Sequence, residues 1–254
     1  MSLNYQTTGE GEAVILLHGL FGSLENLNSI KRALETDYQV VSVDLPDHGD
    51  SPHSQHFSYQ QYADSVLTLM DELKLDKAIV LGHSMGGKVA MTLALQHPDR
   101  VSKLIVADIA PVTYPDRHSG IIEALKSVDL SGLQNRTEAD KQLAKNIDEQ
   151  GIRQFLLKGL QKSDAGWGWR FNLSLLENDY ADITDWPDTS KSYQGPVLFI
   201  KGGRSDYLQA EHKPRIARLF PHSQGHIIQD VGHWLHAEKP QQFNQVVADF
   251  LRQD

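Results

Sequence analysis

Residues 77–87 read Lys77-Ala-Ile-Val-Leu-Gly82-His83-Ser84-Met85-Gly86-Gly87. The apolar run at 78–81 is typical of a buried strand, and a helical pattern follows at 88–96. Between them stands Gly-x-Ser-x-Gly, which is typical of a sharp turn that exposes a serine as a nucleophile. A side chain at Gly82 or Gly86 would clash where strand and helix nearly touch. We therefore predict that Ser84 is a nucleophile. The alternative is a glycine-rich turn around a serine that has no role.

Apolar runs and helical patterns alternate along most of the chain. The runs are nearly continuous in Val, Ile and Leu, as in strands that are buried on both faces of a parallel sheet. The alternation predicts an α/β fold with a doubly wound, mostly parallel sheet. The predicted strands are Val14–Leu17, Gln39–Val43, Ala78–Leu81, Leu104–Ala107, Val197–Ile200 and His226–Ile228. The predicted helices outside the middle of the chain are Leu27–Glu35, Tyr59–Leu73, Lys88–Gln96, Lys213–Leu219 and Pro240–Arg252.

The middle of the chain breaks this alternation. Between residues 111 and 194 only helical patterns appear, and no run resembles a strand. We therefore predict a helical cap, residues 111–194, inserted in a core that residues 1–110 and 195–254 form. The predicted cap helices are Ile121–Val128, Glu138–Asp148, Ile152–Leu160 and Leu173–Leu176.

Composition narrows the classes of protein. The 254 residues carry a net charge of -9, with no clustering of Lys and Arg, which argues against nucleic acid as a partner. Cysteine is absent, so a disulfide scaffold, a thiolate zinc site and a cysteine nucleophile are excluded. The N-terminal sequence does not resemble a signal peptide, and no apolar run approaches the ~20 residues of a membrane span. We expect a cytoplasmic protein with a small-molecule substrate.

Neither a metal nor a nucleotide cofactor is expected. His48, His53 and His56 are close in sequence, but they lie in a loop rich in Pro and Ser without the helical spacing of a metal site. Neither Gly-x-Gly-x-x-Gly nor a P-loop pattern occurs, so a nucleotide cofactor is not indicated.

His233 is the candidate base for Ser84. It follows the last predicted strand, in Asp230-Val-Gly-His233-Trp. Loops after parallel strands gather at the carboxyl edge of a sheet, where Ser84 would also emerge. His236 is the second choice for this role.

The loop that begins with His18-Gly19-Leu20-Phe21-Gly22 follows the first predicted strand. Its glycines allow a close approach to Ser84, so the amides of Leu20 and Met85 are candidate donors to an oxyanion. Met85 would also stand at a helix N-terminus, where free amides favour negative charge. For His18 we favour a structural role.

The acid that would orient His233 has two candidates. Asp108 follows the strand Leu104–Ala107, and Asp206 follows the strand Val197–Ile200. Both stand at carboxyl ends of predicted strands, and an unoriented histidine base would cost several orders of magnitude in rate. The residues alone leave the choice open, and either carboxylate could instead be a helix cap or a surface ion pair.

Taken together, these motifs resemble the α/β-hydrolase superfamily over nearly the whole chain. Within it the chain most resembles the YbfF-type bacterial esterases, in His18-Gly-Leu-Phe-Gly-Ser23, Ala107-Asp-Ile-Ala-Pro111 and Trp169-Arg-Phe-Asn172. The resemblance implies Ser84 as nucleophile, His233 as base and the Leu20 and Met85 amides as oxyanion donors. It also favours Asp108 over Asp206, because this group tends to have serine after the penultimate strand, where Ser205 stands.

The resemblance also implies that the insertion is a lid with substrate contacts. We expect Phe21, Trp169 and Phe171 to contact the substrate, although the aromatic residues at 167–171 could equally be packing within a small cap. The leading hypothesis is a serine hydrolase of carboxylic esters or acyl thioesters that forms an acyl-enzyme on Ser84. Alternatives are another enzyme of the same fold (a C–C hydrolase, lyase or perhydrolase) and a non-catalytic small-molecule binding protein.

Overall fold

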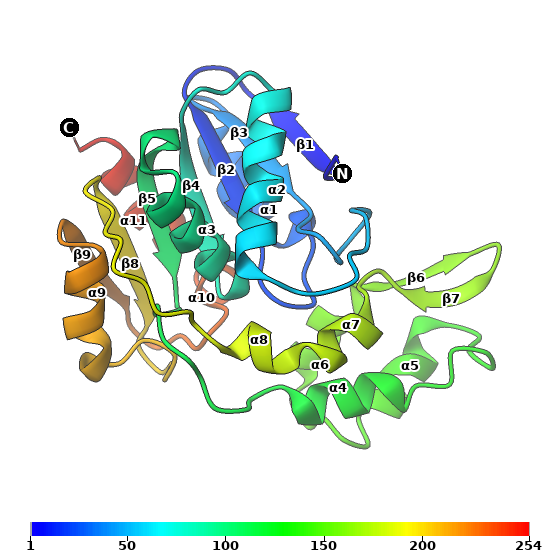
Figure 1. Ribbon diagram of the computed structural model, residues 1–254. Coiled ribbons are helices and arrows are strands. Elements are labelled where there is room, and N and C mark those ends of the chain that lie inside the picture. The colour runs from blue at the N-terminus through cyan, green and yellow to red at the C-terminus, as the bar shows by residue number, and fades with distance from the viewer. Residues whose placement is uncertain (1, 254) are drawn as a thin grey trace.

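A seven-stranded sheet forms the centre of the structure, a computed structural model that describes residues 2–253 (Figure 1). The strand order is β1-β3-β2-β4-β5-β8-β9, and only β1 runs antiparallel to its neighbour. The order reverses between β2 and β4, as the doubly wound prediction requires. The strands are β1 Tyr5–Thr8, β2 Ala13–Leu17, β3 Gln39–Val43, β4 Ala78–His83, β5 Val101–Ala107, β8 Val197–Gly202 and β9 Ser223–Ile228.

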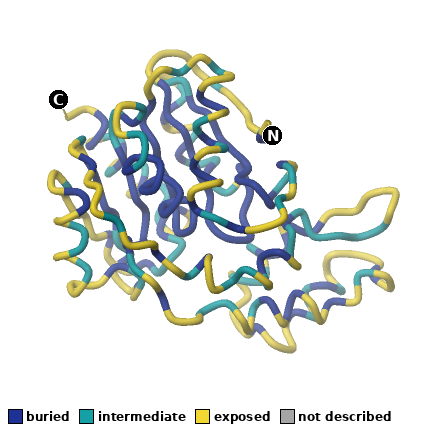
Figure 2. Tube along the Cα trace, viewed as in Figure 1, coloured by how far each residue is buried: buried dark blue, intermediate teal, exposed yellow. Residues whose placement is uncertain are grey.

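Helices cover both faces of this sheet. On one face α2 (Tyr59–Glu72) packs against α3 (Met85–Gln96), and on the other α1 (Asn28–Leu34) packs against α11 (Pro240–Leu251). The central strands are apolar on both sides: in β4, Ala78 and Val80 belong to one core and Ile79 and Leu81 to the other. Figure 2 shows these buried residues concentrated in the strands and in α3. The continuous apolar runs in the sequence follow from this double burial.

Most predicted elements of the core agree with the structure to within a few residues. The helix α9 (Lys213–Leu219) has the predicted bounds, whereas α3 begins at Met85, three residues before the predicted start. Gly86 and Gly87 hid that first turn, because glycine is a poor helix former. The edge strand β1 was not predicted, since its sequence YQTT is polar and mostly exposed. The remaining short helices of the core are 3-10 helices at Leu24–Leu27, Pro98–Arg100 and Ala210–His212, and α10 at Leu235–Glu238.

Residues 111–194, which we call the cap segment, connect β5 to β8 and lie across one end of the sheet (Figure 1). The segment contains the helices α4 Ser119–Lys126, α5 Arg136–Leu143, α6 Gln150–Leu157, α7 Leu173–Asn178 and α8 Tyr180–Thr184. The prediction that it holds helices only is wrong. A hairpin of β6 (Leu160–Ser163) and β7 (Gly166–Trp169) stands between α6 and α7, so the predicted helix Ile152–Leu160 ends early, at Leu157. The strands are four residues each and only partly buried, so they leave no apolar run.

No helix within residues 2–253 is long and apolar enough to cross a membrane.

Candidate active site

Ser84 stands at the turn between β4 and α3, with φ 53° and ψ -121°. Such a backbone is rare for a residue with a side chain, and it turns Ser84 out of the strand. A Cβ on Gly82 would lie 2.1 Å from the carbonyl oxygen of Gly86, and a Cβ on Gly86 would lie 2.4 Å from that of Leu17. The turn therefore requires glycine at both positions, as predicted from the sequence.

A chain of hydrogen bonds runs from Ser84 through His233 to Asp108. The Ser84 Oγ lies 2.9 Å from His233 Nε2, and His233 Nδ1 lies 2.8 Å from Asp108 Oδ2. Because a carboxylate only accepts, Nδ1 carries the proton and Nε2 is free to accept from the serine. The His233 side chain is 14% exposed and the Asp108 side chain 0%. Three residues from the ends of β4, β5 and β9 thus meet at one edge of the sheet.

The carboxylate of Asp108 is held on both oxygens. Oδ1 accepts from the amide of Gly202 at 2.9 Å, and Oδ2 accepts from the hydroxyl of Ser205 as well as from His233. Both donors come from the end of β8 and the turn after it. The contact between Ser205 and Asp108 was not predicted, although the sequence had marked Ser205 as the position where related chains place serine. These bonds fix the direction in which the acid faces His233.

Asp206, the other candidate acid, is not part of the hydrogen-bonded series Ser84, His233 and Asp108. Its carboxylate pairs with Arg117 at 2.6 Å, and its side chain is 66% exposed. The hydrogen bond from Arg117 holds the pKa of Asp206 below its usual value. The structure therefore brings Asp108, and not Asp206, into contact with His233.

His236, the second choice for the base, lies inside the core. Its ring packs against that of His83, with 4.4 Å between centroids, and burial lowers the pKa of His236 to about 3. The His83 ring lies between those of His233 and His236, and His83 Nε2 donates to the backbone carbonyl of His233 at 2.8 Å. His236 therefore packs against His83 beneath the site and does not contact Ser84.

The loop with Leu20 approaches Ser84 closely. A Cβ on Gly19 would lie 3.2 Å from the Cβ of Ser84, so a larger residue would crowd Ser84. Met85 is the first residue of α3, so its amide has no acceptor within the helix. Leu20 and Met85 both line the cavity next to Ser84. Both residues therefore lie next to Ser84, and their amides stay the predicted oxyanion donors.

Two buried histidines hold this loop in place. His18 Nε2 accepts from the amide of Leu45 at 3.0 Å, and His48 Nε2 accepts from the amide of Phe21 at 3.2 Å. Burial lowers the pKa of both imidazoles, to about 3 for His48, so both are neutral acceptors. His18 therefore has the structural contacts that the sequence favoured.

An aromatic stack covers the imidazole of His233. The ring of Tyr207 lies 3.9 Å from it at an angle of 18°, and the guanidinium of Arg117 lies 4.5 Å from the Tyr207 ring. Tyr207 stands in the loop after β8, where the sequence pattern gives no sign of such a contact. The stack shields one face of the imidazole from water.

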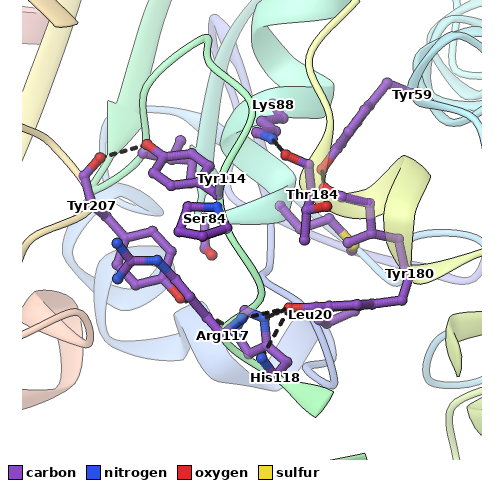
Figure 3. A pocket seen from close by; sticks show the side chains of 14 residues that line it. Leu20, Tyr59, Ser84, Lys88, Tyr114, Arg117, His118, Tyr180, Thr184 and Tyr207 are labelled. Atoms are coloured by element: carbon purple, nitrogen blue, oxygen red, sulfur yellow. Dashed lines mark hydrogen bonds between the residues drawn. The ribbon is translucent and has the colours of Figure 1, made fainter.

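Two small cavities meet at Ser84, each with room for about 30 Å³. The first, which we call the inner pocket, is shown in Figure 3. Its charged and aromatic lining residues are Tyr59, Lys88, Tyr114, Arg117, His118, Tyr180 and Tyr207. The second, the outer pocket, is mostly apolar and includes Phe21, Ile121, Ile152, Phe155, His233 and Trp234.

Of the three predicted substrate contacts, only Phe21 lines either cavity. Phe171 packs against Phe21 at 5.2 Å between ring centroids, and Trp169 stacks on Phe171 at 5.4 Å. Both therefore support the wall behind Phe21, and direct contact with substrate stays a prediction for Trp169 and Phe171. Within residues 2–253 no cluster of three or more His, Asp or Glu is arranged to hold a metal ion.

The fold and this arrangement of residues define the class of protein to which the chain belongs. Residues 12–240 match the family model described as the alpha/beta hydrolase fold, and the chain belongs to that family. It is 44% identical to the sn-1-specific diacylglycerol lipase ABHD11 of Mus musculus, over 94% of this chain and 80% of the mouse protein. It is 36% identical to the esterase YbfF of Escherichia coli K12, over 97% of this chain and 95% of that protein. These matches confirm the family resemblance that the motifs indicated.

A solved structure described as a marine microorganism esterase matches with a TM-score of 0.96 and 38% identity. The match covers 98% of this chain and 99% of the chain of the marine esterase.

Proposed function

We propose that the chain is a serine hydrolase that cleaves carboxylic esters or acyl thioesters through an acyl-enzyme on Ser84. The hydrogen-bonded chain from Ser84 through His233 to Asp108 carries this proposal. An esterase and a lipase among its relatives support esters as the first substrates to test.

The geometry gives each residue a role. Ser84 Oγ attacks the acyl carbonyl while His233 Nε2 takes its proton, and the amides of Leu20 and Met85 stabilise the oxyanion that forms. When the tetrahedral intermediate collapses, the C–O bond breaks and His233 returns the proton to the leaving oxygen. Water then attacks the acyl-enzyme and loses a proton to His233, which passes it to Ser84 Oγ as the bond to the acyl carbon breaks and the acid departs. Asp108 keeps the imidazole in the required tautomer throughout.

We further propose the division into a core, residues 1–110 and 195–254, and a cap, residues 111–194. The inner pocket supports this division, because it lies between the two: Tyr59 and Lys88 come from the core, and Tyr180 and Thr184 from the cap segment. In this arrangement the cap excludes water from the acyl-enzyme and shapes the substrate site.

The test of the proposed function is turnover of short p-nitrophenyl esters by Ser84→Ala. We expect the variant to lose nearly all activity, because within residues 2–253 the Ser84 hydroxyl is the side-chain group that bonds to His233 Nε2. Ser192→Ala, a change at an exposed serine, serves as the control and should keep full activity. Full activity in a folded Ser84→Ala protein would reject the proposed function. Tight binding of intact ester by the wild type without hydrolysis would favour a binding protein instead.

A further inference from the structure

The turn after β8 contacts both the acid and the base of the site. The hydroxyl of Ser205 donates to Asp108 and accepts from the amide of Tyr207 at 3.2 Å. The ring of Tyr207 in turn lies nearly parallel to the imidazole of His233, with 3.9 Å between the centroids and 18° between the planes. One short turn therefore holds the carboxylate and covers the imidazole.

Hydrogen bonds alone do not fix the plane of the His233 ring through the whole reaction. The backbone carbonyl of His233 accepts from His83, which holds the main chain and leaves the ring free to turn about its side-chain bonds. The ring itself bonds to Ser84 and Asp108. On the proposed mechanism the bond to Ser84 is lost once the serine carries the acyl group, and the bond to Asp108 remains. One hydrogen bond sets a direction and not a plane, so a closely packed flat neighbour is needed to prevent tilting.

The cap segment holds the Tyr207 ring in place. The backbone carbonyl of Tyr207 accepts from the hydroxyl of Tyr114, a bond that Figure 3 draws as a dashed line. The Tyr207 hydroxyl lies 3.3 Å from His118 Nε2, and the guanidinium of Arg117 lies 4.5 Å from the centroid of the Tyr207 ring. Arg117 also pairs with Asp206, the residue before Tyr207. Contacts from the cap segment thus restrain the ring and the backbone on both sides of it.

We propose that Tyr207 is a positioning residue for His233, and that Arg117 of the cap segment clamps the Tyr207 ring against the imidazole. The inference rests on the proposed function and adds a residue that acts on its base. The ring keeps the imidazole aligned with Ser84 and Asp108 through both proton transfers. Such a residue acts on the rate without touching the reacting atoms, because a misplacement of about 1 Å can cost about 10²-fold.

The first experiment separates the Tyr207 ring from its hydroxyl by steady-state kinetics with a short p-nitrophenyl ester. Tyr207→Leu removes the flat ring, so kcat should fall about tenfold to a hundredfold with little change in KM. Tyr207→Phe keeps the ring and should recover most of the wild-type kcat. Tyr5→Leu, at an exposed tyrosine of β1, is the control and should match the wild type.

The outcomes of this experiment distinguish the inference from the proposed function. If a folded Tyr207→Leu protein keeps the wild-type kcat, or if Tyr207→Phe loses as much as Tyr207→Leu, the inference is rejected. The proposed function stands in both cases, provided that hydrolysis still requires Ser84. If the wild type hydrolyses no ester, both are rejected.

The second experiment asks whether Tyr207 acts through His233, because Tyr207 also lines the inner pocket. Tyr207→Leu is combined with His233→Ala in a double-mutant cycle, and the residual kcat/KM is measured. Without the imidazole, loss of the Tyr207 ring should change this value by less than about twofold. An equal loss in both backgrounds would mean that Tyr207 acts on the substrate or the fold, and would reject the positioning role.

The same design tests the clamp. Arg117→Met should lower kcat about two- to fivefold, the range expected for loss of a partly exposed cation–π contact, and should have no such effect in Tyr207→Leu. An effect of Arg117→Met that persists without the ring would reject the clamp.

A measurement on the wild type remains decisive if Tyr207→Leu does not fold. In protein with ¹³C-labelled histidine and tyrosine, the stacked ring should shift the His233 ring-proton resonances upfield and give nuclear Overhauser effects between His233 and Tyr207. Unshifted His233 resonances without contacts to Tyr207 would overturn the inference.

Discussion

At the scale of single residues, the site depends on how Asp108 is held. Its carboxylate accepts from Gly202 and Ser205 and still has an oxygen for His233 Nδ1. An Asn in its place could present its amide nitrogen to the imidazole and favour the wrong tautomer, which would leave no free Nε2 for Ser84. The tautomer of His233 thus depends on the hydrogen bonds that orient the Asp108 carboxylate as well as on its charge.

We therefore predict unequal effects of two matched substitutions. Asp108→Asn should lower kcat for ester hydrolysis by about 10³–10⁴, the range typical for loss of the orienting acid. Asp206→Asn should lower it less than about tenfold, because only an exposed ion pair with Arg117 is lost. Steady-state kinetics of both purified variants is the measurement. Similar losses in the two, or a larger loss in Asp206→Asn, would contradict the roles proposed here.

The sequence predicted the positions of Ser84 and His233 because loops at strand ends gather at one edge of a parallel sheet. Strand positions alone did not separate Asp108 from Asp206, since both follow strands and the choice depends on where each side chain points. The family resemblance favoured Asp108. Tyr207 was missed for a related reason. It looks like an ordinary loop tyrosine in its local sequence, and it stacks on His233 only because distant segments meet.

At the scale of elements, the decisive packing is that of β2, β4 and α3 around the turn at Ser84. The helix can begin directly after the serine only because Gly82 and Gly86 let three backbone segments nearly touch. The local pattern of strand, turn and helix was strong enough to predict this part of the fold. The hairpin β6–β7 and the edge strand β1 were not predictable in this way, because short strands that are exposed or only partly buried carry little apolar pattern.

The glycine requirement gives a prediction at this scale. Gly86→Ala should destabilise the fold by ~1–3 kcal/mol or more, because its Cβ would lie 2.4 Å from two backbone oxygens that cannot easily move. Gly120→Ala, in α4, meets nothing within 4 Å and should be neutral or stabilising by ~0.5–1 kcal/mol. Chemical denaturation of both variants checks this. Equal stability of the two would show that the fold does not need the close approach at the turn around Ser84.

At the scale of the whole molecule, buried histidines link stability to pH. Burial lowers the pKa of His48 and His236 to about 3 and that of His118 to about 4. In the unfolded chain these groups take up protons near pH 6.5. Below that pH the unfolded state binds more protons than the folded state, so stability falls as pH decreases toward 4 and is fully present above 6.5.

His236→Gln isolates part of this dependence. The wild type should lose stability between pH 6.5 and pH 4, and the variant should lose less, by up to about 1.4 kcal/mol per pH unit for one proton. His53→Gln, at an exposed histidine, is the control and should follow the wild type. Denaturation midpoints measured across this pH range provide the test. Parallel curves for the wild type and His236→Gln would mean that His236 titrates alike in both states.

The central claim is that His233 activates Ser84 as a nucleophile, and covalent labelling tests it most directly. Phenylmethylsulfonyl fluoride is added to the wild type and to His233→Ala, and intact mass and peptide mapping follow the adduct. The account predicts one adduct per chain, on Ser84, with labelling in His233→Ala slower by orders of magnitude. An adduct on another residue, equal labelling rates in the two proteins, or no labelling of an enzyme that still hydrolyses esters would contradict it.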